Sequence, residues 1–433
     1  MNKNNKKVIN AWCSDDVANS AYNLILTTAI FPIYYQKATH DAFGGNIISF
    51  HGHNFINSAL YVYAIALAYL VIIILSPILS GIADYGGYRK RFMQLFTFLG
   101  SSSCFLMYWF QGSNIGYGLL LVALAVIGYA GSLVFYNSFL PIIATPEHHD
   151  KISAKGFSWG YAGSMLLLII NLITIFYFNL FKIEQAEAIK LSFLEVGIWW
   201  FCIAQIAFHF LKDYPGQKKS QSGILTRGFK KISKVFFQIK HRPSIKLFLL
   251  SFFFFSTGVQ TVILVASLFG SQELGISGTK LIMTIIIIQI LGIVGSTLFA
   301  RVSLRKGNKF SISVMLCIWT AVCISAFFIK TEIEFYMLAA AVGLVMGGIQ
   351  SQARSTYSKL IPTDTTDTAS YFSFYDITEK AAIVLGMFCF GFINQLTGSM
   401  RNSALSLSLF FIISLVILIF SKLPKNVKID SNI

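Results

Sequence analysis

The chain has 433 residues, of which 55% are apolar and only 12% are charged, and its formal net charge is +16. Soluble domains carry about 25% charged residues, so this composition excludes a soluble protein. The longest polar stretch between apolar segments covers residues 212–245. This leaves no room for a separate catalytic, nucleotide-binding or DNA-reading domain.

Apolar segments of about 18 or more residues predict membrane-spanning helices. Twelve such segments follow one another along the chain, at residues 17–36, 55–79, 92–111, 116–140, 157–181, 191–211, 246–271, 279–300, 310–329, 333–353, 371–397 and 403–421. The sequence therefore predicts an all-α membrane protein with twelve transmembrane helices.

The distribution of Lys and Arg predicts the orientation of these helices. Basic residues gather in alternate loops, and the segment from Lys212 to Lys246 alone carries ten of them. Because short cytoplasmic loops are enriched in Lys and Arg, we expect both termini and this long loop to be cytoplasmic, in an inner or plasma membrane. The basic excess then indicates contact with anionic lipids of the bilayer rather than with nucleic acid.

The long basic loop divides the twelve segments into six and six. Two motifs recur at about half the chain length: Gly87 and Gly307 lie in similar basic hairpins, and Pro146 and Pro362 precede similar Phe-Ser pairs. An internal repeat of this kind predicts two related bundles. We expect a six-helix bundle over residues 1–211, a cytoplasmic basic linker over 212–245, and a second six-helix bundle over 246–433.

Within the linker, apolar residues recur at steps of 4, 3, 4 and 3, which predicts an amphipathic helix at the membrane surface. These residues are Leu225, Phe229, Ile232, Phe236 and Ile239. The alternative is a segment that binds a protein partner, as calmodulin targets do.

The hairpin between the second and third segments reads Asp84-x-x-Gly87-x-Arg89-Lys90. Together with the six-plus-six arrangement, it resembles the signature loop of the major facilitator superfamily. The first helix, Asp16-Val-Ala-Asn19-Ser-Ala-Tyr, and the later motif Gly-Gly-Ile-Gln350 are similar to the vacuole-effluxer branch of that superfamily.

This resemblance implies a secondary transporter that works by alternating access, in a branch named for efflux of amino acids from the fungal vacuole. It also implies that Asp84, Gly87, Arg89 and Lys90 form a gating loop that latches the cytoplasmic side. From the residues themselves, Asp84 can accept hydrogen bonds from the N-terminus of a neighbouring helix. The alternative is an ordinary positive-inside loop.

Polar side chains in a membrane span are costly unless they face a water-filled cavity or one another. In the first helix, Asp16, Asn19, Asn23 and Thr27 form one stripe at steps of 3, 4 and 4. We expect this stripe to line the transport cavity, with hydrogen-bonded helix packing as the alternative. Asp15 lies off the stripe and is predicted to cap the N-terminus of this helix.

Three further polar residues are candidates for the cavity. Gln260 lies in the seventh segment, and Gln350 and Arg354 are spaced i, i+4 in the tenth. Because the following loop is short, Arg354 can reach an acid on the eleventh helix.

The eleventh segment begins with Asp376, Glu379 and Lys380. Asp376 and Lys380 can pair along one helical turn. A carboxylate in a low-dielectric cavity shifts readily toward its neutral form, so these residues are candidates for proton coupling. A solvated charge network at the membrane surface is the alternative.

Taken together, the residues predict a secondary active transporter that moves a small solute, such as an amino acid, with protons as a coupling partner. We expect no catalytic residues, no cofactor, no metal and no nucleic-acid partner. The pair His148-His149 lacks the further ligands of a metal site. The alternatives are a membrane-embedded transferase, a channel, and a transporter of sugars or drug-like compounds.

Overall fold

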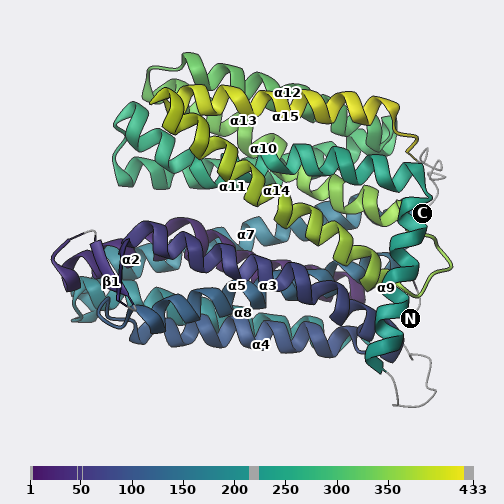
Figure 1. Cartoon of the computed structure of the whole chain (residues 1–433), viewed down its shortest axis with the longest axis horizontal. Helices are drawn as coiled ribbons and strands as arrows, with labels where there is room; N and C mark the ends of the chain where they lie inside the picture. The colour runs from purple at the N-terminus through teal and green to yellow at the C-terminus, as the bar shows by residue number, and fades with distance from the viewer. Residues whose placement is uncertain (1–2, 46, 51, 214–223, 424–433) are drawn as a thin grey trace.

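The structure is a computed structural model that describes residues 3–45, 47–50, 52–213 and 224–423. Long helices lie side by side along one direction (Figure 1). In chain order the elements are α1 (Lys6–Ala21), the π-helix η1 (Tyr22–Ala29), α2 (Phe31–Phe43), β1 (Ile47–Phe50), β2 (His53–Ile56), α3 (Asn57–Gly86), α4 (Arg89–Leu106), η2 (Met107–Trp109), α5 (Ile115–Ser138), α6 (Leu140–Ile143), η3 (Pro146–His148), α7 (His149–Phe176), η4 (Phe178–Phe181), α8 (Gln185–Phe210), α9 (Ile224–Lys240), α10 (Pro243–Leu274), α11 (Gly278–Lys306), α12 (Asn308–Phe328), α13 (Glu332–Leu360), α14 (Thr368–Thr397) and α15 (Met400–Phe420).

The twelve predicted spans correspond to α1 with η1 and α2, then α3, α4, α5, α7, α8 and α10 through α15. Nine of these helices, within the described residues, are long and apolar enough to cross a membrane. The other three predicted spans are less apolar, each for a reason that the structure shows. The first is broken into pieces, α4 opens with three basic residues, and α14 carries the charged group at 376–380.

The first helix begins earlier than predicted, at Lys6 instead of residue 17. Asn5 is its cap, and the Asn5 side chain accepts hydrogen bonds from the backbone N–H groups of Lys7 and Val8. The prediction that Asp15 caps the helix is therefore wrong. Asp15 lies within α1 and is 1% exposed, because α1 also carries Ile9, Trp12 and Cys13 into the first hydrophobic core.

One element was not expected from the sequence. β1 and β2 form a two-stranded antiparallel hairpin, with Ile47 opposite Ile56 and Phe50 opposite His53. It joins α2 to α3 at the end of the molecule far from α9 (Figure 1). The apolar segments were long enough to dominate the prediction, and a hairpin of four-residue strands gives too short a pattern to stand out.

The helices pack around two hydrophobic cores. Trp12 and Trp200 belong to the first core, which is built almost entirely from residues before 212. Trp319 and Tyr357 belong to the second, which is built almost entirely from residues after 235. Figure 1 shows the helices of the first half on one side and those of the second half on the other, so the interface between the two groups runs along the length of the spans.

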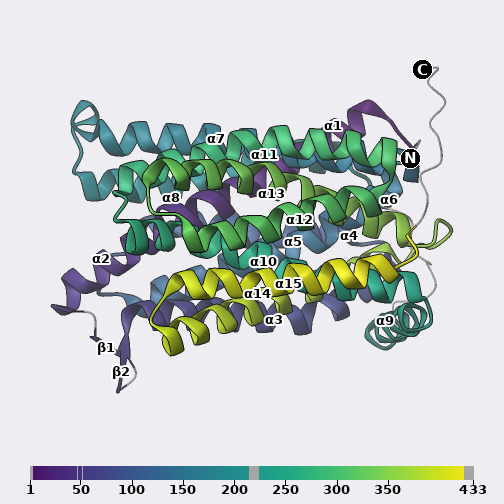
Figure 2. The same cartoon turned by 90° about the horizontal axis from the view of Figure 1, so that it is seen from above.

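The amphipathic helix α9 lies across one end of the bundle, where α1 begins and α15 ends (Figures 1 and 2). Its side chains Ile232, Val235 and Ile239 are buried. Phe229 and Phe236, on the same predicted apolar face, are 60% and 55% exposed, so this part of the face does not pack into the protein. The position of this face at the membrane surface stays a prediction. The side chain of Leu225 lies outside the described residues.

Two glycines set how closely α9 approaches the first half. A Cβ atom on Gly81 of α3 would overlap the backbone carbonyl of Gly228, so only glycine permits this contact. We expect Gly81→Ala to displace α9, because overpacking of a close backbone contact costs about 1–3 kcal/mol. Hydrogen exchange of residues 228–239 should then speed up by roughly tenfold or more.

The matched control is Gly391→Ala. Gly391 is also helical, but a Cβ atom there would meet nothing within 4 Å. The interpretation of the Gly81 contact fails if both variants leave the exchange of α9 unchanged.

Candidate functional site

The two halves are joined by polar contacts at the end of the bundle that carries α9. Asp84, at the end of α3, accepts hydrogen bonds from the backbone N–H groups of Ala369 (3.2 Å) and Ser370 (2.7 Å) at the start of α14. Arg89 donates to the Asp84 carboxylate at 2.8 Å through Nε, and it also donates to the carbonyl of Thr366. The predicted gating loop thus contacts the N-terminus of a helix in the other half, where a carboxylate is favoured.

The other two residues of the predicted loop shape it. Gly87 ends α3 with φ of 72°, a left-handed conformation that favours glycine. The backbone N–H of Lys90 donates to Asp213 at 2.6 Å, so Lys90 ties the loop to the start of the linker, directly after α8. Burial raises the pKa of the Asp213 carboxyl, and the hydrogen bond from Lys90 lowers it in part.

A second polar cluster joins the halves at the same end, and sequence reasoning missed it. The carboxylate of Asp150, at the start of α7, accepts hydrogen bonds from Ser303 (2.8 Å), Asn308 (2.9 Å) and Lys359 (2.7 Å). Here the region of the hairpin between α11 and α12, together with the end of α13, supplies the donors, and the opposite half supplies the acid. The internal repeat gives no hint of this contact, because Leu304 occupies the position in the second hairpin that the acid Asp84 occupies in the first.

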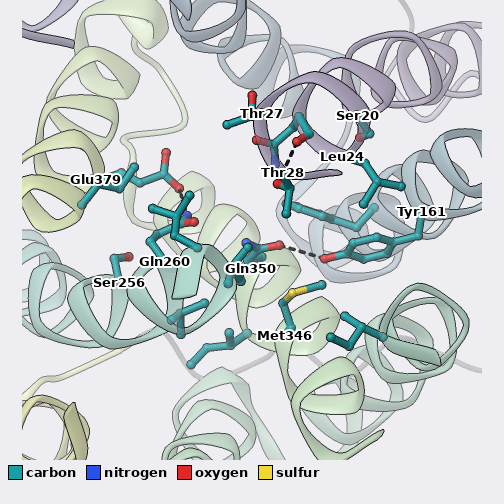
Figure 3. A pocket seen from close by; sticks show the side chains of 18 of the residues that line it. Ser20, Leu24, Thr27, Thr28, Tyr161, Ser256, Gln260, Met346, Gln350 and Glu379 are labelled. Atoms are coloured by element: carbon teal, nitrogen blue, oxygen red, sulfur yellow. Dashed lines mark hydrogen bonds between the residues drawn. The ribbon is translucent and has the colours of Figure 1, made fainter. Parts of the chain in front are cut away.

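Beyond these contacts a cavity of about 220 Å³ lies between the halves. The seven residues predicted to line it all do so, and so do Glu379 and Lys380, whereas Asp376 is not among the lining residues. In Figure 3 the hydroxyl of Tyr161 on α7 donates to Gln350 on α13, at 2.8 Å, across the cavity. The lining residues predicted from the sequence are Asp16, Asn19, Asn23, Thr27, Gln260, Gln350 and Arg354.

Arg354 forms an ion pair across the halves. Its Nη2 lies 3.1 Å from Oδ2 of Asp16, and its Nη2 and Nε donate to the carbonyl and hydroxyl of Ser153 at 2.9 and 3.0 Å. Arg354 is 3% exposed. The predicted contact with an acid on the eleventh helix is therefore wrong, because Asp16 lies nearer on the facing helix.

Aromatic rings complete the surroundings of this guanidinium. Its Cζ lies 4.7 Å from the ring centroid of Trp12 and 4.3 Å from that of Phe157. Cation–π contacts of this kind are strongest away from water. They help to hold the Arg354 guanidinium in place beside Asp16, at the wall of the cavity.

Lys380 is the centre of a second charged cluster, on α14. Its Nζ lies 3.2 Å from Asp376 and 2.8 Å from Glu379. Gln260 on α10 donates to Glu379 at 3.1 Å. Asp376 and Lys380 are each 3% exposed, so the alternative of a solvated network at the membrane surface is wrong for this conformation.

Two other polar contacts bear on the cavity and were not foreseen. Gln289 donates to Ser164 at 3.1 Å, between α11 and α7. Its position directly after four isoleucines is the sequence signal that could have identified it as a buried polar residue. Asn19 donates to the buried Asp15 at 3.2 Å. Asn19 therefore lines the cavity and also satisfies part of the buried Asp15 carboxylate.

The family model described as vacuole effluxer Atg22 like matches residues 4–428. The chain belongs to this family of major facilitator superfamily transporters. The Atg22-like chain is 31% identical to the Bacillus subtilis protein named uncharacterized MFS-type transporter YxiO, over 97% of this chain and 96% of that protein. It is 24% identical to autophagy-related protein 22-1 of Penicillium rubens, over 92% of this chain and 79% of that protein.

The fold of this Atg22-like protein is also that of solved transporters. A crystal structure of the Escherichia coli fucose:proton symporter FucP superposes with a TM-score of 0.67 and 14% identity, covering 96% of this chain and 98% of that one. Members of the family are multi-pass membrane transporters and not enzymes, which removes the transferase alternative. A transported small molecule follows from the family.

Proposed function

We propose that this Atg22-like protein transports amino acids by alternating access and couples that transport to protons. The observation that carries the proposal is the presence of two charged clusters on one small cavity. Asp16 and Arg354 form the first, and Glu379 and Lys380 belong to the second. Each cluster offers one negatively and one positively charged side chain, which suit the ammonium and carboxylate ends of a zwitterion.

The Asp16–Arg354 pair supports direct binding of such a substrate. A substrate carboxylate can replace Asp16 on the Arg354 guanidinium, while the substrate ammonium group takes up the released Asp16 carboxylate. Drug-sized ligands occupy pockets of roughly 300–1,000 Å³, whereas this cavity measures about 220 Å³. The volume therefore supports a small solute over a drug-like compound.

The cluster on α14 supports proton coupling. Lys380 balances only one of the two carboxylates that contact it. Two carboxylates that share a site away from water disfavour double ionisation. Glu379 lines the cavity and Asp376 does not, so we propose Glu379 as the group that takes up the proton and Asp376 as its partner.

The names of the relatives support export as the direction, since the matching family is described as vacuole effluxers. We propose that the end with α9 and both termini faces the cytoplasm of a cell membrane, as the basic residues indicate. The contacts around Asp84 and Asp150 close that end, so the cavity then exchanges solute with the opposite side. The proposed unit boundaries stay at 1–211, 212–245 and 246–433.

The test of the substrate is transport by the purified full chain in liposomes, with a panel of labelled amino acids and labelled monosaccharides. We expect accumulation of an amino acid that depends on an imposed pH gradient and collapses with a protonophore. Accumulation of a monosaccharide with no movement of any amino acid would contradict the proposal that the substrate is an amino acid. It would favour the second candidate, a sugar held by the amide groups of Asn23, Gln260 and Gln350.

The test of proton coupling is Glu379→Gln. We expect this variant to lose gradient-driven accumulation by roughly tenfold or more, because it removes the exchangeable proton and keeps the size of the side chain. Exchange of labelled for unlabelled substrate, which needs no net proton movement, should persist. Glu273→Gln is the matched control, since Glu273 pairs with Arg401 and does not line the cavity. Equal accumulation by wild type and Glu379→Gln would exclude Glu379 as the proton carrier.

A further inference from the structure

The helix α9 contacts both halves of the transporter at its closed end. Gly228 lies against Gly81 of α3, in the first half. Lys231 pairs with Asp367 at 2.5 Å, just before α14 in the second half. Gln238 accepts a hydrogen bond from the hydroxyl of Tyr371, at 2.8 Å, on α14 itself. The inner side of α9 therefore bridges the two halves.

These contacts stand beside the latch. Asp367, which binds Lys231, is followed within three residues by Ala369 and Ser370, whose N–H groups donate to Asp84. Opening of this end requires the start of α14 to leave Asp84. The same movement separates Asp367 from Lys231, because α9 is packed against α3 on the other side. The position of α9 is thus coupled to the state of the latch.

The outer face of α9 has a different chemistry. With Gly228, Ile232, Val235 and Ile239 turned inward, helical geometry places residues 230, 234 and 237 on the opposite side. Lys230 and Lys234 are exposed there, and Phe237 is 61% exposed. Phe229 and Phe236 are exposed on the flank.

Figures 1 and 2 show α9 running across the ends of the spans, at the level where α3 ends and α14 begins. Lysines interleaved with exposed aromatic rings, on a helix that lies in this plane, suit the surface of an anionic bilayer. The lysines meet phosphate groups and the rings meet the acyl boundary. An acidic soluble protein would pair with the lysines but would leave the exposed phenylalanine rings without an apolar partner.

We propose that anionic phospholipids bind the outer face of α9 and thereby stabilise the latched state of the transporter. Lipid that holds α9 at the bilayer surface keeps Lys231 on Asp367 and the start of α14 on Asp84. A ligand that binds one state better shifts the equilibrium toward it. This regulation does not depend on which solute is carried.

The experiment uses hydrogen exchange of the full chain in nanodiscs of phosphatidylcholine alone or of phosphatidylcholine mixed with phosphatidylglycerol. The readout is the protection of residues 366–372, whose amides include those bound to Asp84. We expect the anionic lipid to slow their exchange by roughly tenfold, the size expected of a few lysines at an anionic surface. High salt should remove the effect.

The variant K230Q/K234Q removes two exposed charges from α9, and R301Q/R305Q removes two exposed charges from α11 on the same side of the protein. We expect the first to lose the response to phosphatidylglycerol and the second to keep it. The proposal is overturned if wild type shows no response, if K230Q/K234Q responds as wild type does, or if both variants lose the response equally. Unchanged protection of α5 in each sample shows that the variants are folded.

Discussion

Replacing Arg354 by Gln is expected to abolish transport and to lower the free energy of unfolding by about 3–5 kcal/mol, because breaking a buried ion pair leaves one charge without compensation. The stranded charge is Asp16, which is 5% exposed. The change also removes the donors to Ser153 and the cation between Trp12 and Phe157. Thermal unfolding in detergent and uptake into liposomes measure the two effects.

A double variant separates the structural role of the pair from its role in binding. We expect Asp16→Asn combined with Arg354→Gln to regain most of the lost stability, since neither charge is then stranded. Transport should stay absent, because the groups that bind the two ends of the substrate are gone. Recovery of transport in the double variant would show that the pair is structural and would contradict our assignment of the substrate site.

Replacing Asp84 by Asn is expected to release the latch. Asp84 accepts two backbone N–H bonds from α14 and a bond from Arg89, and hydrogen bonds to a charged group contribute about 1.5–3 kcal/mol each. Loss of the charge should shift the equilibrium away from the closed end by roughly 3 kcal/mol, or about a hundredfold. Faster hydrogen exchange at residues 366–372 and reduced transport would both report it.

Asp213→Asn is the control for this variant. Asp213 accepts a backbone N–H bond from the same hairpin, through Lys90, but it lies at the start of the linker, directly after α8, and not in the second half. We expect this variant to leave exchange at residues 366–372 near the wild-type rate. If Asp84→Asn and Asp213→Asn behaved alike, the hairpin would affect folding of the first half instead of holding the two halves together.

The spans could be predicted from the sequence, because an apolar segment of bilayer length has no alternative but a helix when water cannot satisfy its backbone. The sequence also indicated part of the cavity lining. The stripe of Asp16, Asn19, Asn23 and Thr27 lies on one helical face, and such a face has to be turned away from lipid. The contact of Asp84 with a helix N-terminus followed from the chemistry of a carboxylate beside a turn.

Which polar groups contact one another could not be predicted from the sequence and depends on how the helices pack. Arg354 binds Asp16, 338 residues away, and Asp150 binds donors from three places in the second half. Local periodicity places a side chain on a face of its helix but carries no information about the helix opposite. The burial of Asp15 and the exposure of Phe229 have the same cause, since each depends on the angle at which its helix packs on its neighbours, and that angle is set by contacts between distant segments.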